Sequence, residues 1–386
     1  MQNFTYVNPT KIHFGEGAIL KLGEELKALC VERALLVYGK ASIFANGVHD
    51  AVMQQMATAG VEVVEHGGVQ GNPVLSHTRA GIEKARHHEV DAICAVGGGS
   101  VIDEAKAICA GVNTNVDVWD LFTMKASPGE VLPLLAVCTL PATGSEMNGI
   151  CVVTNEETKE KIAMVKPGAL NPKVSFLDPE VTKTLTAEQT AFACTDILSH
   201  IMEAYFTTSA KRLPLQDNLL EGVAKATVEA MDLIMAHPDD YDARAAFMWA
   251  ATMAWSGIAQ AGIPGPSMPC HALEMPLSAV YDIAHGAGLS VVIPAWIRHS
   301  AKGHLSRIAA FAKAVFKVDA CDAASIASAL RVYYRRIGSP VTFVEAGIAH
   351  PDMDRLVQLA SASLAQRGMT DYTPKVVRAI YNECME

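Results

Sequence analysis

Four side chains in the second half of the chain have the types and spacing of a divalent-metal site, namely Asp196, His200, His271 and His285. The first two lie four residues apart in a run that is typical of a helix, so their side chains share one face. The other two lie fourteen residues apart, and one straight helix would separate them by about 21 Å. They reach one ion only if the chain bends between them, and a proline and two glycines in the segment 276–288 favour such a bend. Three neutral imidazoles and one carboxylate suit Zn(II) or Fe(II) better than Ca(II) or Mg(II).

A simpler explanation of these four residues is open as well. Most of the thirteen histidines are expected to be solvated or hydrogen-bonded, and an Asp and a His four residues apart are also a common pair on a helix surface. However, His200 and His271 lie in apolar stretches, where an unpaired imidazole is costly unless it is coordinated. Their surroundings therefore favour a metal site.

A second group of residues has the features of an anion-binding turn. A strand-like apolar run is followed directly by Gly97, Gly98, Gly99 and Ser100, which begin a helix-like run. Backbone N–H groups at a helix start bind anions, and glycines let a pyrophosphate approach closely. Ser100 is suited to cap this helix or to bind phosphate, and Asp103 favours its positive end. A tight turn in any α/β protein also uses glycine, and this turn matches neither G-x-G-x-x-G nor a P-loop, but three consecutive glycines favour nucleotide binding.

A polar loop at residues 139–146 follows the next strand-like run. Open α/β sheets bind ligands at the carboxyl ends of their parallel strands, so this loop and the glycine turn are expected to line one crevice. By itself the loop could also be an ordinary capped turn.

The elements that must position these residues fall into two regions. Up to residue 184, apolar β-rich runs alternate with amphipathic runs, which predicts an α/β fold with a doubly wound, Rossmann-like parallel sheet and helices on both faces. One hairpin is expected over residues 150–165. From residue 185 on, Ala- and Met-rich runs with helical period replace the β-rich ones. We therefore expect a nucleotide-binding α/β domain at 1–184 and an all-helical metal-binding domain at 185–386.

Composition limits the class of partner. The 386 residues include 31 basic and 41 acidic side chains, a net charge of −10, which argues against nucleic acid or an anionic membrane as partner. We find no apolar run of about 20 residues that would span a membrane, and the N-terminus lacks the features of a signal peptide. The nine cysteines contain no C-x-x-C pair. A reducing compartment, the cytoplasm, is expected.

With both loops and the four ligands in view, the chain resembles the iron-containing (group III) alcohol dehydrogenase family, and within it the NADPH-dependent butanol dehydrogenase and aldehyde reductase branch. The resemblance rests on seven motifs in order along essentially the whole chain, at residues 10–18, 71–73, 97–106, 139–146, 177–179, 196–203 and 271–286. It implies an α/β nucleotide-binding domain, an all-helical metal domain and an active site in the cleft between them.

The resemblance also implies roles for individual residues. The catalytic metal ligands would be Asp196, His200, His271 and His285. The pyrophosphate would be held by Gly97, Gly98, Gly99, Ser100 and Asp103. The ribose and nicotinamide would lie along Thr139, Leu140, Thr143, Ser145 and Lys161, with Asn72 near the adenosine end and Asn148 near the substrate.

Three positions depart from the family pattern. Many members carry a second histidine, often invoked as a proton relay, where this chain has Met275. Many carry an asparagine after the last ligand, where this chain has Leu289. The residue after the first core strand is often an Asp that binds the ribose diol of NAD, and here it is Gly39.

The turn after this strand bears on the choice of cofactor. An acidic side chain there binds the ribose 2′-OH of NAD and repels the 2′-phosphate of NADP. In this chain Gly39 leaves room, while Lys40 and Ser42 offer a positive charge and a hydroxyl to a phosphate. Gly39 could also serve only the turn, with Lys40 in solvent. We expect NADP(H) in preference to NAD(H).

These observations together predict reversible hydride transfer between a nicotinamide cofactor, NADP or NAD, and a primary alcohol or aldehyde, with one divalent metal as Lewis acid. The alternatives are an NAD-dependent zinc polyol dehydrogenase of the glycerol type, a non-redox enzyme such as dehydroquinate synthase, or a non-catalytic nucleotide- or metal-binding protein. Four intact ligands beside an intact glycine turn argue against the last. We expect a small-molecule substrate and a homodimer, and the sequence leaves both the substrate and the choice of Fe(II) or Zn(II) open.

Overall fold

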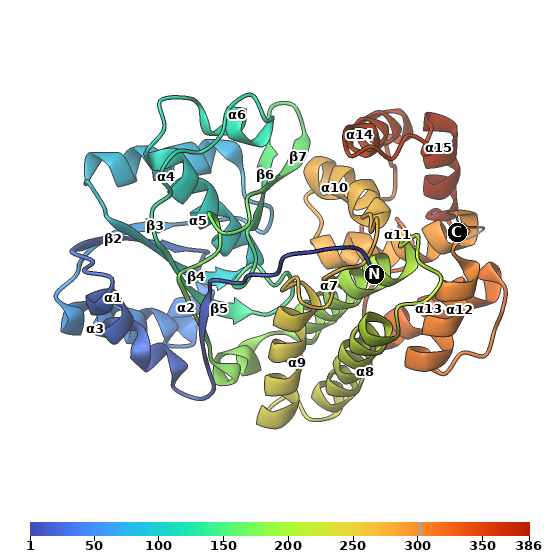
Figure 1. Ribbon diagram of the computed structural model, residues 1–386, viewed down its shortest axis with the longest axis horizontal. Coiled ribbons are helices and arrows are strands. Elements are labelled where there is room, and N and C mark those ends of the chain that lie inside the picture. The colour runs from blue at the N-terminus through green and yellow to red at the C-terminus, as the bar shows by residue number, and fades with distance from the viewer. Residues whose placement is uncertain (301–302) are drawn as a thin grey trace. The chain divides into compact units, whose positions relative to one another are not determined.

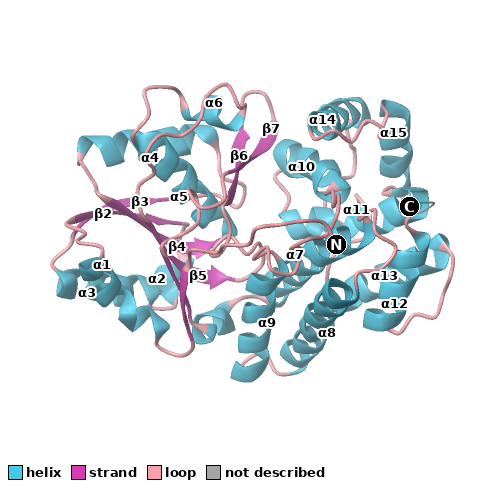
Figure 2. Cartoon of the chain, in the orientation of Figure 1, coloured by secondary structure: helices cyan, strands magenta, loops and turns pink. Residues whose placement is uncertain are grey.

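The computed structural model describes residues 1–300 and 303–386, which form two compact units (Figure 1). The α/β unit contains Val7–Leu185 and Asp239–Thr252. The helical unit contains Met1–Tyr6, Thr186–Pro238 and Met253–Glu386. The strands lie in the α/β unit, and the helical unit is built from helices and loops (Figure 2). This arrangement confirms the predicted fold class.

The α/β unit is built on a parallel sheet of six strands in the order β1-β8-β5-β4-β2-β3. These strands are β1 (Lys11–Phe14), β2 (Arg33–Tyr38), β3 (Glu62–Gly67), β4 (Ala92–Gly98), β5 (Leu134–Leu140) and β8 (Val174–Leu177). Strands β6 (Ile150–Asn155) and β7 (Glu160–Val165) form a separate antiparallel pair. This pair is the hairpin predicted over residues 150–165. The helical elements of this unit are η1 (Ala18–Lys21), α1 (Leu22–Ala28), α2 (Ser42–Ala45), α3 (Val48–Ala59), α4 (Leu75–His87), α5 (Gly99–Val112), α6 (Val118–Phe122) and η2 (Pro179–Thr184).

Apolar side chains on both faces of the central strands explain why helices cover both sides of the sheet. In β2, Leu35 and Val37 pack in one core with residues of α4 and α5, whereas Ala34 and Leu36 pack in a second core with residues of α1 and α3. Successive side chains of a strand point to opposite faces, so a strand that is apolar throughout must be buried twice. The continuous apolar runs in the sequence therefore predicted the layers correctly.

The strand order contains a reversal between β2 and β4. The chain passes from β2 outward to β3 and then returns to the other side of β2 to form β4. Ligands of open α/β sheets bind at such a reversal. The segments that follow β2 and β4 lie next to each other here, because Tyr38 pairs with Val96.

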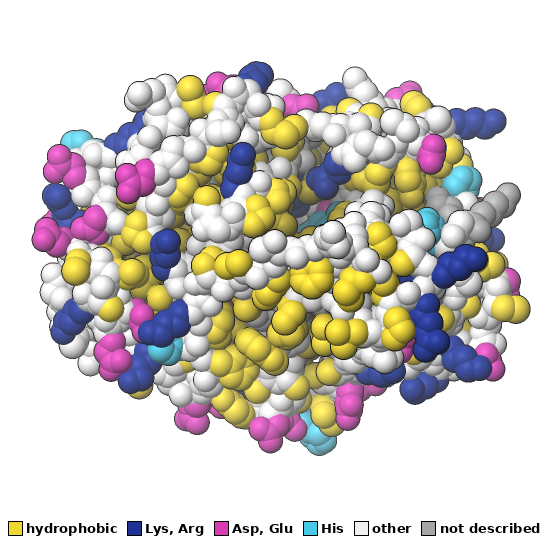
Figure 3. Space-filling model, viewed as in Figure 1, with side chains coloured by type: hydrophobic (Ala, Val, Ile, Leu, Met, Phe, Trp, Pro, Cys, Tyr) yellow, Lys and Arg dark blue, Asp and Glu magenta, His cyan; other side chains and the backbone are white. Residues whose placement is uncertain are grey.

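The helical unit consists of long helices that follow the helical periods seen in the sequence. They are α7 (Ala187–Phe206), α8 (Pro214–Ala236), α10 (Pro269–Tyr281), α11 (His285–Ser300), α12 (Leu305–Phe316), α13 (Ala323–Ile337), α14 (Met353–Gln366) and α15 (Pro374–Glu383). None of the helices in the described part of the chain is long and apolar enough to cross a membrane. Basic and acidic side chains are interspersed on the face shown in Figure 3.

The sequence predicted a single boundary between residues 184 and 185. Two stretches of the chain lie in the unit on the other side of that boundary. Helix α9 (Tyr241–Ala254) lies largely in the α/β unit, where Trp249 packs edge-on against Phe14 and Thr252 donates a 2.6 Å hydrogen bond to Glu146. The N-terminal residues lie in the helical unit, where Gln2 N donates to the carbonyl of Gly262 at 2.9 Å. Such contacts join residues far apart in sequence, so helical periodicity does not reveal them. The boundary between independent domains stays a prediction.

Helix α7 begins with a reciprocal cap. Removing this cap tests how much the first turn of α7 stabilises the helical unit. Thr186 Oγ1 accepts from Gln189 N at 3.1 Å, and Gln189 Oε1 accepts from Thr186 N at 3.0 Å. We expect Thr186→Ala to lower the free energy of unfolding by about 1 kcal/mol, because it removes the hydroxyl that caps the helix. Urea denaturation followed by circular dichroism measures this change. Thr186→Ser keeps the hydroxyl and is the control; an equal loss in both variants would contradict the role of the cap.

Candidate active site

Helix α7 presents the first two predicted metal ligands on one face. Asp196 and His200 lie one turn apart and are 3% and 6% exposed. The helix is buried along most of its length, so both side chains are shielded from solvent. A carboxylate in this setting is costly unless a cation or hydrogen-bond donors compensate its charge.

The other two predicted ligands lie on consecutive helices. His271 is on the first turn of α10, and His285 is the first residue of α11. The bend between them is at Asp282, which has the left-handed φ of 54°. Pro276, which the sequence suggested as a breaker, lies inside α10 instead. A proline removes one helical hydrogen bond, and the buried residues on either side of Pro276 hold the helix together.

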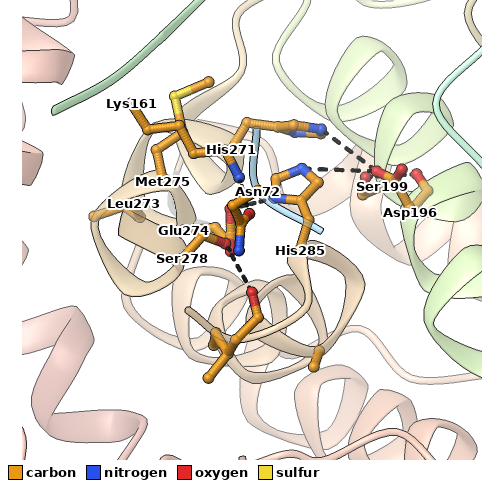
Figure 4. Close-up of polar contacts among 12 residues, drawn as sticks. Asn72, Lys161, Asp196, Ser199, His271, Leu273, Glu274, Met275, Ser278 and His285 are labelled. Atoms are coloured by element: carbon orange, nitrogen blue, oxygen red, sulfur yellow. Dashed lines mark hydrogen bonds and ion pairs between the residues drawn. The ribbon is translucent and has the colours of Figure 1, made fainter. Parts of the chain in front are cut away.

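All three imidazoles converge on one carboxylate oxygen. The Nε2 atoms of the three histidines each lie 3.8 Å from Asp196 Oδ1, and Figure 4 shows His271 and His285 directed toward Asp196. This distance is too long for hydrogen bonds. Ligand atoms around a tetrahedral ion with bonds of about 2.0–2.2 Å are about 3.3–3.6 Å apart, which is close to the spacing found. Asp196 Oδ1 is buried and accepts no hydrogen bond from the described residues. The four side chains therefore fit a divalent cation.

Two buried glutamates orient two of these imidazoles. Glu203 pairs with Nδ1 of His271, and Glu274 pairs with Nδ1 of His285. Glu203 also accepts from the backbone N–H of Cys270 at 2.5 Å. A carboxylate at Nδ1 holds the proton there, so that Nε2 keeps the lone pair that binds a metal.

Sequence analysis missed the roles of both glutamates, for different reasons. Glu203 belongs to the motif at 196–203, but its role was missed. Glu274 was not identified at all, although an acid in the apolar run around it is a signal of a buried partner.

The protonation of His200 also suits a metal ligand. Burial lowers the pKa of His200 to about 3, and the nearby carboxylate of Asp196 only partly opposes this effect. The imidazole is therefore neutral near pH 7, as coordination requires. Its ring stacks on Trp255 with centroids 5.0 Å apart.

Met275 occupies the position of the second histidine in the family pattern. Its sulfur accepts from Arg367 Nη2 at 3.2 Å. A thioether does not exchange protons, so a proton relay from this position is absent, as the departure in the sequence indicated.

The glycine turn joins β4 to α5, with Gly98 as the residue before the helix and Gly99 as its first residue. The sequence suggested Ser100 as a possible cap, but Ser100 lies within the first helical turn and its hydroxyl donates to the carbonyl of Gly71 at 2.5 Å. The cap position falls on Gly98 because the strand continues through Gly97 and Gly98. Ser100 therefore ties the turn to the loop after β3.

Packing of the protein itself favours glycine at these three positions, most strongly at Gly97 and Gly99. A Cβ atom on Gly97 would meet Val101 at 2.5 Å, one on Gly98 would meet Leu140 at 3.0 Å, and one on Gly99 would meet Thr143 at 2.4 Å. The turn therefore lies directly against the end of β5 and the loop at 139–146. A side chain at any of the three positions would disturb this packing as well as any bound phosphate.

Asp103 connects α5 to the segment after the polar loop. Its Oδ1 accepts from Ser145 Oγ at 2.6 Å, and its Oδ2 accepts from Val152 N at 2.9 Å. Burial raises the pKa of Asp103, and the charge of Lys106 opposes this rise. Asp103 lies beyond the first turn of α5, where the sequence had suggested an interaction with the helix end.

Lys106 fastens the polar loop from the same helix. Its buried ammonium donates to Ser145 Oγ at 2.7 Å, to Asn148 O at 2.8 Å and Oδ1 at 3.2 Å, and to Ile150 O at 2.8 Å. Burial lowers the pKa of Lys106 to about 8 against the opposing charge of Asp103. The sequence placed Lys106 in a motif without giving it a role. Asn148, predicted near the substrate, has its amide in this network.

The remaining predicted cofactor residues lie at the carboxyl ends of β2 and β5 and beside the hairpin. Gly39, Lys40 and Ser42 follow β2, with Lys40 and Ser42 exposed. Thr139 and Leu140 end β5. Asn72 and Lys161 meet through a 2.8 Å hydrogen bond from Lys161 Nζ to Asn72 Oδ1. The structure thus places most of these predicted residues at or after the ends of β2, β4 and β5, whereas Asn72 and Lys161 lie at the hairpin.

Removing a ligand tests the metal centre. We expect His271→Ala and His285→Ala each to lose most of the bound metal and to lower kcat/KM by orders of magnitude, because three ligands hold the ion less tightly and with the wrong geometry. Mass spectrometry of the metal content and circular dichroism check this result. His237→Ala, at an exposed histidine of the same unit, is the control. Stoichiometric metal with near wild-type turnover in either ligand variant would refute the assignment.

The glutamates allow a subtler test. We expect Glu274→Gln to weaken metal affinity by about 10–100-fold while leaving the four ligands in place, because the amide no longer fixes the protonated Nδ1 of His285. Competition with a chelator measures the affinity. Glu188→Gln, an exposed acid on α7, should leave the affinity unchanged; the same affinity in both variants would show that Glu274 has no orienting role.

Comparisons with known proteins agree with this geometry. The model of the family described as iron-containing alcohol dehydrogenase matches residues 9–179, and that of the C-terminal part of the Fe-containing alcohol dehydrogenase family matches residues 190–385. The chain is 37% identical over 369 residues to the probable NADH-dependent butanol dehydrogenase 1 of Bacillus subtilis (strain 168), with 94% of each chain covered. It is 32% identical over 396 residues to the NADPH-dependent aldehyde reductase YqhD of Escherichia coli (strain K12), with 99% of each covered.

A solved structure gives the same result. The crystal structure of NADH-dependent butanol dehydrogenase A from Thermotoga maritima matches with a TM-score of 0.95 at 38% identity, covering 100% of this chain and 99% of that one. Since the family models span most of the sequence and these relatives exceed 30% identity over nearly all of it, the chain belongs to the iron-containing alcohol dehydrogenase family.

Proposed function

We propose that this protein interconverts primary aldehydes and primary alcohols with NADP(H), using Fe(II) or Zn(II) held by Asp196, His200, His271 and His285. The class of enzyme, a metal-dependent alcohol dehydrogenase or aldehyde reductase that uses NAD(P), follows from the family. The proposal adds the phosphorylated cofactor, the ligand set and the substrate. The observation that carries it is the placement of three Nε2 atoms at 3.8 Å from one buried carboxylate oxygen.

The protein's own groups prepare this site in three ways. A bound divalent metal supplies a Lewis acid for the substrate oxygen, and a nicotinamide supplies or accepts the hydride. Glu203 and Glu274 hold protons on Nδ1, so the lone pairs of His271 and His285 stay available. Burial keeps His200 neutral and Asp196 shielded from water. Aldehyde reduction consumes one hydride and one proton. Met275 cannot supply this proton, so its source would be water, the cofactor ribose or another group.

An enzyme assay on a panel of C2 to C8 aldehydes tests the proposed substrate class. The same preparation should be assayed with NADPH and with NADH, and its iron and zinc should be measured after anaerobic purification. Aldehyde-dependent oxidation of the cofactor that is lost on chelation and restored by Fe(II) or Zn(II) supports the proposal. Activity on glycerol with NAD but not on aldehydes would favour a polyol dehydrogenase instead.

The turn after β2 supports the choice of NADP(H). The named relatives include both an NADH-dependent and an NADPH-dependent enzyme, so similarity alone leaves the question open. In this chain the turn carries Gly39 and the exposed Lys40 and Ser42. A Cβ atom on Gly39 would lie 3.7 Å from Val69 O and 3.9 Å from Val101 Cγ2, which are ordinary contacts. There is consequently room for a larger group beside a cationic side chain and a hydroxyl.

We propose in addition that the enzyme works in the cytoplasm as a homodimer. All nine cysteines are free thiols, as expected in a reducing compartment. Strand β1 lies at the edge of the sheet and offers a row of backbone groups to which a second copy can pair. Sedimentation analysis of the purified protein measures the oligomeric state, and a monomer at micromolar concentration would contradict the dimer.

A single substitution tests the cofactor preference. We expect the wild type to show a higher kcat/KM with NADPH than with NADH, and Gly39→Asp to lower the NADPH value by about tenfold or more, because a carboxylate repels the 2′-phosphate. Steady-state kinetics with both cofactors measures the effect. Gly39→Asn has the same size without the charge and is the matched control. A wild-type value for NADH equal to or above that for NADPH would refute the preference.

A further inference from the structure

The α/β unit contains a second cluster of metal-ligating side chains, formed by His66, His77 and Glu104. They come from β3, α4 and α5 respectively. Glu104 is fully buried, His66 is 4% exposed, and the side chain of His77 is 25% exposed. Nothing in the proposed reaction uses this cluster, and its residues differ from those of the metal centre on α7, α10 and α11.

The three side chains point at one another. Glu104 Oε1 lies 2.6 Å from His77 Nδ1 and 3.3 Å from His66 Nε2. One ligand atom from each residue lies within 4.8 Å of the other two. The two imidazoles are stacked with centroids 4.2 Å apart and planes 29° apart, and His200 and His271 in the candidate active site stack at 4.8 Å with the same angle. The two clusters thus share the arrangement of paired imidazoles beside a carboxylate.

Two buried polar atoms of the cluster lack hydrogen bonds. His66 Nε2 and Glu104 Oε2 have no hydrogen-bond partner among the described residues. A carboxylate oxygen and an imidazole nitrogen left in this state each cost free energy, and native proteins usually satisfy them with water, a proton or an ion. A cation bound among these residues would take the lone pair of His66 Nε2 and offset the carboxylate charge.

The neighbouring glycine fits this arrangement. A Cβ atom on Gly81 of α4 would lie 2.9 Å from His66 Nε2, so the absence of a side chain there lets α4 lie against β3 without displacing the imidazole. His77 lies on the exposed side of the cluster, where water reaches it. A fourth ligand for an ion is therefore available from solvent.

We propose that His66, His77 and Glu104 form a second divalent-metal site that holds Zn(II) as a structural ion. Two imidazoles, one carboxylate and one water are a ligand set that zinc accepts. The ion would connect β3 and α4 to α5, the helix that begins at the glycine turn. In the metal-free protein, a proton shared between His77 and Glu104 takes the place of the ion. Zinc must displace a proton from His77 or Glu104, so its affinity rises with pH.

This site can be tested by counting the zinc ions bound per chain in a variant that lacks two of the proposed catalytic metal ligands. The protein is stripped with a chelator, loaded with Zn(II) above neutral pH, desalted and measured by mass spectrometry. We expect two zinc ions per chain in the wild type, one in the double variant His271→Ala/His285→Ala, and none when Glu104→Gln is added. We also expect Zn(II) to raise the melting temperature of the double variant and to lose this effect with Glu104→Gln.

Two controls separate a metal site from a packing effect. Glu104→Gln keeps the shape of the side chain and can still hydrogen-bond His77, so that a folded protein is expected, which circular dichroism checks. His87→Ala changes an exposed histidine of α4 and should retain the zinc of the double variant. If the double variant binds no zinc, or binds it equally with and without Glu104, the cluster is only a buried hydrogen-bonded group. The readouts need no turnover, so this outcome leaves the proposed reaction untouched.

Discussion

Burial of the Asp196 carboxylate among three neutral imidazoles is the constraint on which the helical unit depends. Without a cation the carboxylate has neither solvent nor a hydrogen-bond donor at Oδ1, and such a group is expensive in a protein interior. The cation compensates this cost only if the ligands come from rigid elements. Helix α7 supplies two of them one turn apart, and the sharp bend at Asp282 returns His285 to the same point as His271. Two further buried acids, Glu203 and Glu274, are explained by the same requirement, because they orient the imidazoles.

The α/β unit satisfies a comparable demand with hydrogen bonds. A nucleotide site needs free backbone N–H groups at a helix start and a closely packed loop beside it. Glycines bring the start of α5 against β5, and one turn later Asp103 and Lys106 hold the polar loop in place. The buried ammonium of Lys106 is compensated by four oxygen atoms and by the nearby carboxylate. Charges inside this unit therefore position the loop beside the glycine turn.

In both units, some of the predicted site residues lie where a helix begins. The glycine turn lies where β4 becomes α5, and His285 lies where α11 begins. Regular hydrogen bonding satisfies the interior of each element, whereas its ends present groups that a ligand can use. The cluster of His66, His77 and Glu104 takes one side chain from the end of β3, one from the first turn of α4 and one from the interior of α5.

The sequence alone determined the class of fold and the family, and it predicted a set of four metal ligands that the structure brings close together. Apolar runs and helical periods are local, so they revealed the strands of a doubly covered sheet and the shared face of Asp196 and His200. Only the tertiary structure decided which distant side chains meet. The pairing of Glu274 with His285, the anchoring of the polar loop by Lys106, and the position of α9 in the α/β unit depend on packing between elements. The same holds for Ser100, whose partner is a carbonyl 29 residues away. Periodicity states which face of an element is buried, but the partner of a polar group is set by the neighbour that packing brings to it.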